Sequence, residues 1–326
     1  MSRLSAAVIG LGKIGIGYDL TSWADRDVVL THAKAYLMHK RYDLKFGIDT
    51  DKERRDVFSK YTGKPAYNYL KETGMKNIDI VSVCVPTGHH LNVIKEIVKN
   101  LRVKYILCEK PIADNESDYR EIVAICRRNN IKLVVNYMRR WDPAVFKIKQ
   151  MLQRKYFGEI RAVHCYYTKG LFNNASHSID LLHYWFSGEY KIKVINAKKS
   201  VTKNDIDASF VMYYKGFEAV FQCGYENDYS MFEIDILTEK GRVRYDDFGE
   251  KVGFYKITPD RIFDNYNRID DSFYEIKDDM GRYQYHVMQG IYNSMCGKTG
   301  ILSNGVSSGK TLGTCLEVKK LCKNLQ

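Results

Sequence analysis

Several kinds of sequence feature are missing from this chain of 326 residues. No apolar run is long enough to span a bilayer, and Met1–Ser5 leads directly into a strand without a signal peptide. No dense basic block with interleaved aromatic residues occurs, which argues against a nucleic-acid partner. The eight cysteines form no C-x-x-C pair and no metal-ligand spacing, so we expect no metal site. These absences predict a cytoplasmic protein in a reducing compartment, without a membrane partner.

The composition is that of a globular protein. Apolar residues make up 45% and charged residues 28% of the chain, and the length suits two domains of ordinary size. The net charge is +12, but the lysines are spread singly or in pairs between acidic residues. Such a general positive field favours small anionic ligands, including a cofactor that carries phosphate. No internal repeat and no low-complexity linker interrupts the chain.

The most informative stretch is a short apolar strand, Ala6–Ile9, that ends in a glycine-rich turn. The turn has the spacing G-x-G-x-x-G and is formed by Gly10, Gly12 and Gly15, with Lys13 and Ile14 between the last two. The first glycine permits a tight turn, the second lets the backbone approach a pyrophosphate, and the third permits close packing on the strand. A glycine-rich turn without a ligand is the alternative, but its place directly after a strand favours a dinucleotide.

An insertion separates this turn from the next helix. Ile16–Leu30 is poor helix material, and helical character resumes only at Thr31, which we expect to be an N-cap. The next strand, Leu44–Ile48, ends at Asp49, which lies 34 residues beyond Gly15. An acidic residue at this place normally follows the glycines by about 20 residues and binds the adenosine ribose hydroxyls. Removing Ile16–Leu30 brings the spacing close to that value.

The choice of cofactor depends on the residues around Asp49. A carboxylate there would repel a 2′-phosphate, which favours NAD over NADP. Lys52, Arg54 and Arg55 lie near enough in the sequence to keep NADP open.

Strands then alternate with helices up to about residue 140. This pattern predicts a doubly wound parallel sheet, in which ligands lie beyond the carboxyl ends of the strands. Gly10, Pro86 and Lys110 all fall at such ends. The expected elements are strands at Ile78–Val85, Tyr105–Cys108 and Ile131–Asn136, and helices at His90–Asn100 and Asn115–Asn129.

The pattern changes in the second half, where a helix (Pro143–Tyr156) is followed by runs that alternate apolar and polar residues. Alternation predicts a mainly antiparallel sheet with one buried and one open face. We therefore expect two domains, residues 1–140 and residues 141–326. The expected strands are Arg161–Thr168, Ala208–Tyr214, Ala219–Tyr225, Phe232–Leu237 and Val252–Ile257, and the expected helices are Ser176–Phe186, Met280–Cys296 and Ser307–Asn324.

Lys110 and His177 are the candidate catalytic residues. Lys110 ends a buried strand before a proline, where an ammonium could stabilise an alkoxide, although a solvated lysine in a turn is equally compatible. His177 follows Ser176, which we expect to be the N-cap of a buried helix. The helix dipole would then favour a neutral imidazole that serves as a base, and a structural core histidine is the alternative. A zinc site formed by His177 and His183 fails, because positions i and i+6 of a helix point about 120° apart.

The order of these motifs resembles the glucose–fructose oxidoreductase / inositol dehydrogenase (Gfo/Idh/MocA) family. The resemblance rests on Gly10–Gly15, Val85–His90, Glu109-Lys110-Pro111, Asn136–Pro143 and His177–Asp180, and is most specific in Glu-Lys-Pro and H-x-x-D. It implies a Rossmann-like NAD(P)-binding domain, followed by a substrate domain whose open sheet face carries the sugar and a subunit contact in a homodimer or homotetramer. It also implies that Lys110 polarises the reacting hydroxyl and that His177 is the general acid/base. By the same resemblance, the cofactor is bound by Gly10, Gly12, Lys13, Ile14, Gly15, Asp49, Pro86, Thr87, His90, Glu109 and Lys110, and the substrate by Lys110, Arg139, Arg140, Asn173 and His177.

Asn173 departs from the family pattern, because many members have an aspartate four residues before the histidine. An amide cannot raise the pKa of the histidine as a carboxylate would. Asparagine here resembles the branch that oxidises nucleotide-linked amino sugars or their uronates. We therefore predict an NAD(P)-dependent oxidoreductase of a sugar or nucleotide-sugar hydroxyl. A reductase of a non-sugar carbonyl or imine, and a sensor that binds NAD(P) without turnover, are the alternatives.

Overall fold

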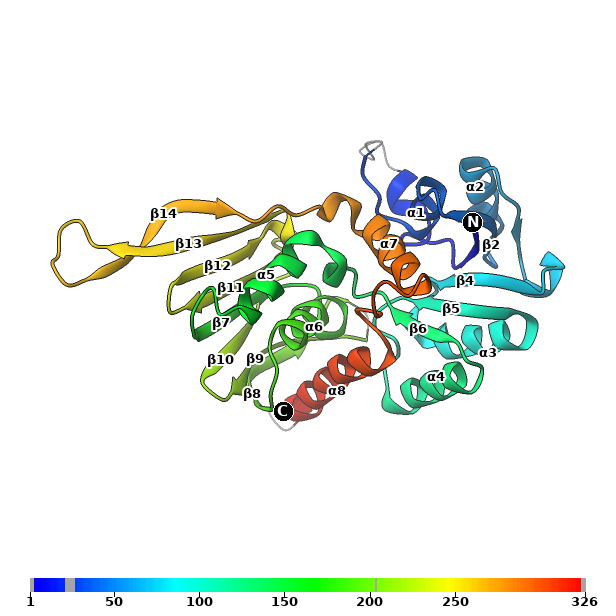
Figure 1. Ribbon diagram of the computed structural model, residues 1–326. Coiled ribbons are helices and arrows are strands. Elements are labelled where there is room, and N and C mark those ends of the chain that lie inside the picture. Colours follow the sequence, from blue (N-terminus) through cyan, green and yellow to red (C-terminus); the bar gives the residue numbers. More distant parts are fainter. Residues whose placement is uncertain (1–2, 21–26, 203, 324–326) are drawn as a thin grey trace. The chain divides into compact units, whose positions relative to one another are not determined.

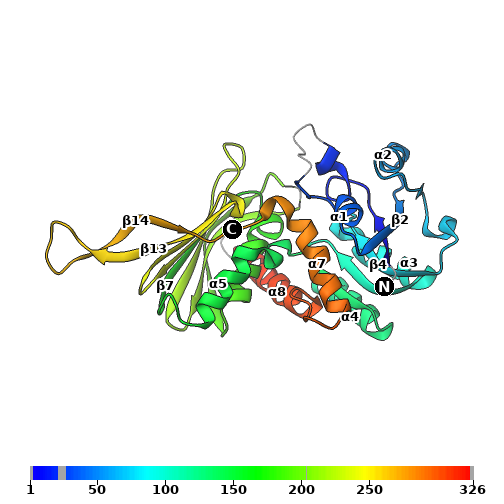
Figure 2. The same cartoon turned by 45° about the horizontal axis from the view of Figure 1, so that its top comes forward.

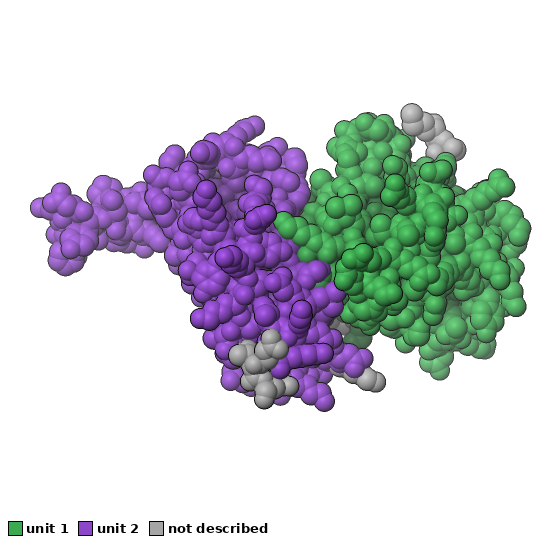
Figure 3. Space-filling view, turned by 90° about the horizontal axis from the view of Figure 1, so that it is seen from below, with its two compact units in different colours: residues 1–141, 281–312 green, residues 142–280, 313–326 purple. Residues whose placement is uncertain are grey.

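The structure is a computed structural model that describes residues 3–20, 27–202 and 204–323. The chain forms two compact units, shown in different colours in Figure 3. Unit 1 contains residues 1–141 and 281–312, and unit 2 contains residues 142–280 and 313–326. The expected division into two domains after residue 140 does not include one feature of the structure. Residues 281–312, which contain an expected helix of the second domain, belong to unit 1.

Unit 1 is built on a six-stranded parallel sheet in the order β3-β2-β1-β4-β5-β6. Because the strand order reverses between β1 and β4, the switch point for ligand binding lies at the carboxyl end of β1, where the glycine turn begins. The doubly wound fold expected for this part of the chain is confirmed. The strands are β1 (Leu4–Ile9), β2 (Tyr42–Ile48), β3 (Ala66–Tyr67), β4 (Asn77–Val83), β5 (Arg102–Cys108) and β6 (Lys132–Val135).

Helices cover both faces of this sheet (Figures 1 and 2). One face carries α1 (His32–Met38), α2 (Lys52–Thr62) and α7 (Tyr283–Met295), and the other carries α3 (His90–Asn100) and α4 (Glu116–Arg128). With both faces covered, the central strands are apolar throughout, and Val8, Ile80 and Leu107 are fully buried.

Polar side chains cap the first turns of several helices. The Thr31 hydroxyl accepts a hydrogen bond from the Lys34 N–H, which confirms the expected cap of α1. Asp51 caps α2 in the same way. Asn115 caps α4, and Asp142 caps α5 (Pro143–Gln153).

Unit 2 is built on an eight-stranded sheet in the order β14-β13-β12-β11-β7-β10-β9-β8. All neighbours are antiparallel except β7 and β10, so the mainly antiparallel sheet is confirmed. Three of its strands, β8, β12 and β14, were not predicted. The strands are β7 (Ile160–Tyr167), β8 (Tyr190–Lys199), β9 (Ile206–Tyr214), β10 (Phe217–Cys223), β11 (Phe232–Thr238), β12 (Gly241–Asp246), β13 (Lys251–Pro259) and β14 (Asn267–Glu275).

One face of this sheet is covered by α5, α6 (Ser176–Trp185) and the end of α8 (Gly305–Cys322), as Figure 1 shows. Val163 and Cys165 of β7 are fully buried, whereas His164 and Tyr166, with the opposite side-chain direction, are partly exposed. The expected alternation is therefore present. Short helical turns complete the two units: Gly17–Leu20, Leu70–Thr73, Thr87–His89, Met138–Trp141, Leu171–Ala175, Asp247–Gly249 and Met280–Arg282.

Candidate functional site

The glycine turn of unit 1 is packed closely at two of its glycines and open at the third. Gly10 has φ +94°, and a Cβ there would lie 2.6 Å from the Cys84 carbonyl carbon. A Cβ at Gly15 would collide with the Gly10 carbonyl oxygen. At Gly12 an added Cβ would meet only the Arg54 guanidinium, at 3.8 Å. The turn is therefore open at Gly12, where a pyrophosphate needs close access to the backbone.

Asp49 lies directly beside this turn, as its place after β2 predicts. Its Oδ2 accepts a hydrogen bond from the Leu11 N–H at 2.8 Å, and its Oδ1 accepts one from the Asp51 N–H at 2.9 Å. A carboxylate oxygen can accept more than one hydrogen bond, so this carboxylate can still bind ribose hydroxyls.

The three basic residues after Asp49 have different partners. The Arg54 guanidinium lies 3.7 Å from the Asp49 carboxylate and beside Gly12. Arg55 donates to the main-chain carbonyls of Asp49 and Thr50, and Lys52 pairs with Asp56. Arg54 is therefore the one of the three that flanks both the acid and the turn.

Hydrogen bonds join the two ends of the insertion that follows the turn. The buried Asp19 carboxylate accepts hydrogen bonds from the Thr31 N–H at 2.8 Å and the Thr31 hydroxyl at 2.6 Å. The Val29 N–H donates to the Gly281 carbonyl, and the Tyr283 hydroxyl donates to the Leu30 carbonyl. The returning chain is thereby joined to the start of α7, and α1 begins at the place from which the insertion departed. Residues 21–26 of the insertion lie outside the described residues.

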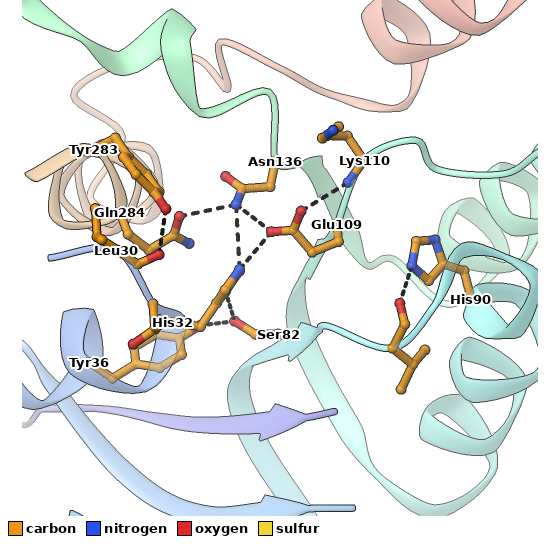
Figure 4. A network of polar contacts seen from close by, with 12 residues as sticks. Leu30, His32, Tyr36, Ser82, His90, Glu109, Lys110, Asn136, Tyr283 and Gln284 are labelled. Carbon is orange, nitrogen blue, oxygen red and sulfur yellow. Dashed lines mark hydrogen bonds and ion pairs between the residues drawn. The ribbon is translucent and has the colours of Figure 1, made fainter. Parts of the chain in front are cut away.

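Glu109, at the end of β5, is the centre of a polar network drawn in Figure 4. Its Oε1 accepts hydrogen bonds from His32 Nε2 at 2.8 Å and from Asn136 Nδ2 at 2.6 Å. Asn136 Nδ2 also lies 3.1 Å from Oε1 of Gln284. Burial alone would raise the pKa of the Glu109 carboxyl, but the His32 and Asn136 hydrogen bonds and the Lys110 charge lower it below its ordinary value. Glu109 is therefore held as an anion whose side chain is only 13% exposed.

Two buried atoms of this network have no hydrogen-bond partner among the described residues: Oδ1 of Asn136 and Nε2 of Gln284. One is an acceptor and the other a donor, and buried polar atoms of this kind are normally paired. A carboxamide, such as that of nicotinamide, supplies both complementary groups. Together with the open turn at Gly12, these atoms fit a nicotinamide dinucleotide.

Lys110 follows Glu109 and is half-buried at the carboxyl end of β5. Its main-chain N–H donates to Glu109 Oε2 at 3.3 Å, and the Lys110–Pro111 peptide bond is cis. Pro86 and Thr87 lie at the carboxyl end of the neighbouring strand, β4, and are exposed and half-buried, respectively. Glu109 and Lys110 therefore share one edge of the sheet with the glycine turn, as expected.

His90 and the two arginines after β6 occupy buried positions. The ring nitrogens of His90 lie 2.9 Å from the Val85 carbonyl and 3.1 Å from the Ile112 carbonyl, so this side chain lies between two loops. Arg139 and Arg140 are 5% and 4% exposed. Arg140 donates to the Leu302 carbonyl at 2.8 Å, which connects the end of β6 to the segment before α8.

His177 lies in unit 2, on helix α6, and is 4% exposed. Its ring meets Phe232 of β11 edge to face, with 6.2 Å between the ring centroids. The expected cap by Ser176 is wrong, because a π-helical turn (Leu171–Ala175) continues directly into α6. The Ser176 hydroxyl instead donates to the Phe172 carbonyl at 2.7 Å. His177 therefore lies beyond the first turn of the helical segment, and the dipole argument for its neutral state does not apply.

Asn173 lies in the π-helical turn, four residues before His177, and is exposed. Its N–H and that of Phe172 donate to the Asp205 carboxylate, at 2.9 and 3.0 Å. Gly170, with φ +86°, is required here because a Cβ would collide with that carboxylate. Asp205 thus anchors the start of the helical segment that carries His177. No local signal in the sequence connects it to Asn173, 32 residues earlier.

On the same helix, Asp180 is buried and His183 is half-buried. Asp180 is 1% exposed, and His183 Nε2 lies 3.1 Å from the Tyr190 hydroxyl, a structural contact within unit 2. Within residues 3–20, 27–202 and 204–323, no group of three His, Cys, Asp or Glu side chains could hold a metal ion. Over the same residues, no helix has the length and hydropathy to cross a membrane.

The chain was compared with known proteins. Residues 4–137 match the model of a family described as "Oxidoreductase family, NAD-binding Rossmann fold". The uncharacterized oxidoreductase YrbE of Bacillus subtilis is 35% identical over 88 residues, which are 27% of this chain and 24% of the relative. The inositol 2-dehydrogenase of Salmonella typhimurium is 24% identical over 187 residues, 51% of this chain and 54% of the relative. The chain thus matches between a quarter and about half of the length of these relatives.

Solved structures resemble the whole chain at low identity. The WlbA dehydrogenase from Bordetella pertussis, in complex with NADH and UDP-GlcNAcA, has a TM-score of 0.75 and 16% identity, covering 100% of this chain and 97% of its own. The UDP-N-acetylglucosamine 3-dehydrogenase GnnA from Acidithiobacillus ferrooxidans has a TM-score of 0.76 and 17% identity, covering 100% of both chains. At this level of identity the likeness establishes the fold.

Proposed function

Residues 4–137 belong to the Gfo/Idh/MocA oxidoreductase family, and from that premise we propose that the protein is an NAD-dependent dehydrogenase of a sugar or nucleotide-sugar hydroxyl. The observation that carries the proposal is the hydrogen bond between the Asp49 carboxylate and the Leu11 N–H. It places an acid suited to ribose hydroxyls beside the open turn at Gly12, on the same sheet edge as Glu109 and Lys110.

The cofactor proposal follows from the residues that surround the turn. The backbone at Gly12 would hold the pyrophosphate and Asp49 the adenosine ribose. Arg54 is exposed and already pairs with Asp49 and Asp51, so we assign NAD rather than NADP to this site. When bound, NAD supplies the acceptor or donor of the hydride.

Lys110 and His177 have separate roles in this proposal. The Lys110 ammonium stabilises the oxyanion that develops on the substrate, and the His177 imidazole takes the hydroxyl proton. The order of the Glu-Lys-Pro and H-x-x-D motifs, which resembles that of the family, supports this pairing. Asn173 and the two buried arginines are proposed to contact the substrate. The open sheet face that carries His164 and Tyr166 is proposed as the contact of a homodimer or homotetramer.

The substrate class is narrowed by two observations. Asn173 replaces the aspartate of many family members. Structural relatives include a dehydrogenase solved with UDP-GlcNAcA and a UDP-N-acetylglucosamine 3-dehydrogenase. Both observations support a nucleotide-linked amino sugar, or its uronate, as the substrate.

A turnover assay tests the proposal. Purified protein is mixed with NAD and a panel of UDP-linked sugars, free sugars and non-sugar alcohols, and NADH formation is followed by absorbance. We expect turnover with a nucleotide-linked sugar and at least 100-fold less with the Lys110→Met variant. Turnover with a non-sugar alcohol alone would contradict the substrate class. NADH binding without turnover of any compound, in either direction, would indicate a sensor.

A further inference from the structure

A chain of buried hydrogen bonds leads from Tyr36 to Glu109 (Figure 4). The Tyr36 hydroxyl lies 2.8 Å from Ser82 Oγ, and Ser82 Oγ lies 2.9 Å from His32 Nδ1. His32 Nε2 lies 2.8 Å from Glu109 Oε1. Tyr36, His32 and Ser82 are at most 1% exposed. The chain therefore connects α1 and β4 through fully buried groups to Glu109 at the end of β5, whose side chain is 13% exposed.

The number of hydrogens fixes the direction of this chain. Ser82 is the only hydrogen-bond partner of the Tyr36 hydroxyl among the described residues. Burial raises the pKa of Tyr36, so the phenol keeps its proton and must donate it to Ser82. The single hydroxyl hydrogen of Ser82 is then donated to His32 Nδ1. The ring proton of His32 consequently lies on Nε2 and is donated to Glu109. The opposite direction would leave the Tyr36 hydroxyl hydrogen buried without an acceptor.

We propose that His32 is a positioning residue, fixed by Tyr36 and Ser82 as the Nε2-protonated tautomer, which keeps Glu109 ionised and oriented beside Lys110. His32 does not touch the substrate in this proposal and acts through Glu109. Asn136 donates to the same oxygen, Oε1, and the Lys110 N–H donates to Oε2. Without His32, the buried carboxylate would lose one of its two short hydrogen bonds and would protonate at a higher pH.

The other titratable groups near Glu109 do not supply a competing charge. Burial lowers the pKa of His90, so this imidazole is neutral in the physiological range. Burial likewise raises the pKa values of Tyr283, Cys84 and Cys108, which keeps these groups protonated. The groups that face Glu109 are His32 from α1, Cys84 after β4, Cys108 of β5, His90 from α3, Tyr283 from α7 and the neighbouring Lys110. Loss of the Glu109 charge would therefore act mainly on Lys110.

The tautomer is tested on the protein without ligands, by long-range ¹⁵N–¹H correlation NMR of histidine-labelled protein. The His32 signals are assigned by their absence from the spectrum of the His32→Gln variant. We expect a proton on Nε2 and none on Nδ1 at pH 7. A doubly protonated ring, or a proton on Nδ1 alone, would overturn the inference. This readout needs no turnover, so it stands apart from the proposed function.

The positioning role rests on the proposed function and is tested by the pH profile of kcat/KM. Leucine at position 32 keeps most of the volume but donates no hydrogen bond, whereas glutamine restores an N–H donor. We expect His32→Leu to raise the lower of the two pKa values in the acid limb, which belongs to Glu109, by about one to two pH units, and His32→Gln to return it toward wild type. Equal shifts in both variants, or no shift in either, would contradict the role.

His39 provides a matched control, because it is 2% exposed, follows the same helix and has Gln289 as its side-chain partner, not Glu109. His39→Leu and His39→Gln are expected to leave the acid limb in place. If His39→Leu moved it as far as His32→Leu, the effect would be one of packing and the inference would be wrong. If His32→Leu does not fold, the NMR measurement on wild-type protein still decides.

Discussion

Glu109 in unit 1 and His177 in unit 2 lie in different surroundings. Glu109 is surrounded by polar partners, with His32 and Asn136 donating to one carboxylate oxygen. His177 lies on a helix in which nine residues are buried, and its ring packs against Phe232. A group held by hydrogen bonds depends on the number and direction of donors, whereas a packed group depends on volume. The two sites are therefore expected to respond to opposite kinds of substitution.

The largest loss of stability is expected for a substitution of Phe232, which packs against His177. Phe232 is fully buried and meets both His177 and Tyr245 edge to face. We expect Phe232→Ala to lower the free energy of unfolding by about 3–5 kcal/mol, because it leaves a cavity. Urea unfolding measures this change, with Phe232→Leu as the control that retains most of the volume. A loss below 1 kcal/mol in Phe232→Ala would show that packing does not fix this site.

Asp49, the carboxylate proposed to bind the adenosine ribose, tests how strongly hydrogen bonds to a charged group contribute to cofactor binding. We expect Asp49→Ala to weaken NADH binding about 10- to 100-fold, because hydrogen bonds to a charged group contribute about 1.5–3 kcal/mol. Fluorescence titration with NADH and NADPH measures the effect, and Arg54→Ala serves as a comparison that should lower NADPH affinity more than NADH affinity. If wild-type protein binds NADPH more tightly than NADH, the assignment of Asp49 is wrong.

Replacing Asn136 at several pH values tests how much the hydrogen bonds of Glu109 contribute to stability. These bonds lower the Glu109 pKa in the folded state. They therefore stabilise the fold at pH values above the unfolded-state pKa of about 4.3, and this stabilisation is lost as the pH falls through the folded-state pKa. We expect Asn136→Leu to reduce the free energy of unfolding by about 1–3 kcal/mol at pH 7, and by less at acidic pH, where Glu109 is protonated in both proteins. Urea unfolding at several pH values measures this, and a penalty independent of pH would contradict the account.

Asn173 gives the smallest expected effect. The side chain is exposed, so a new carboxylate there would be partly screened by solvent. We expect Asn173→Asp to move the pH–rate profile upward by at most about one unit, because the negative charge stabilises the imidazolium of His177. The profile of kcat against pH measures the shift. A downward shift would show that position 173 does not act on the histidine.

Much of the fold was predictable from the sequence, because local signals and the buried strands agree. Thr31 caps α1 as expected, and α3 has the predicted bounds, His90–Asn100. Strand β14 escaped prediction because this edge strand carries mostly charged and polar side chains. The assignment of α7 to unit 1 could not be predicted either, since the chain returns to that unit after nearly 140 residues.

The site was predictable only where a motif carries it. The glycine turn, Asp49 and Glu109-Lys110 lie at one sheet edge because parallel strands end there. His32 and Ser82 are 50 residues apart and belong to no motif used in the prediction, so their hydrogen bond could be found only in three dimensions. The same holds for Asp205, whose contact with Asn173 depends on the pairing of β9 in the sheet.

The most direct test of the account is to measure kcat and NADH affinity for wild type, Lys110→Met and His177→Ala on one accepted nucleotide sugar. General acid–base catalysis contributes about 10²- to 10⁴-fold in rate, so both variants should lose kcat in that range. NADH affinity should remain within a few-fold of wild type in both, because the glycine turn and Asp49 carry the binding. Near-full turnover in His177→Ala, together with no turnover in Lys110→Met, would contradict the account and make the lysine the base.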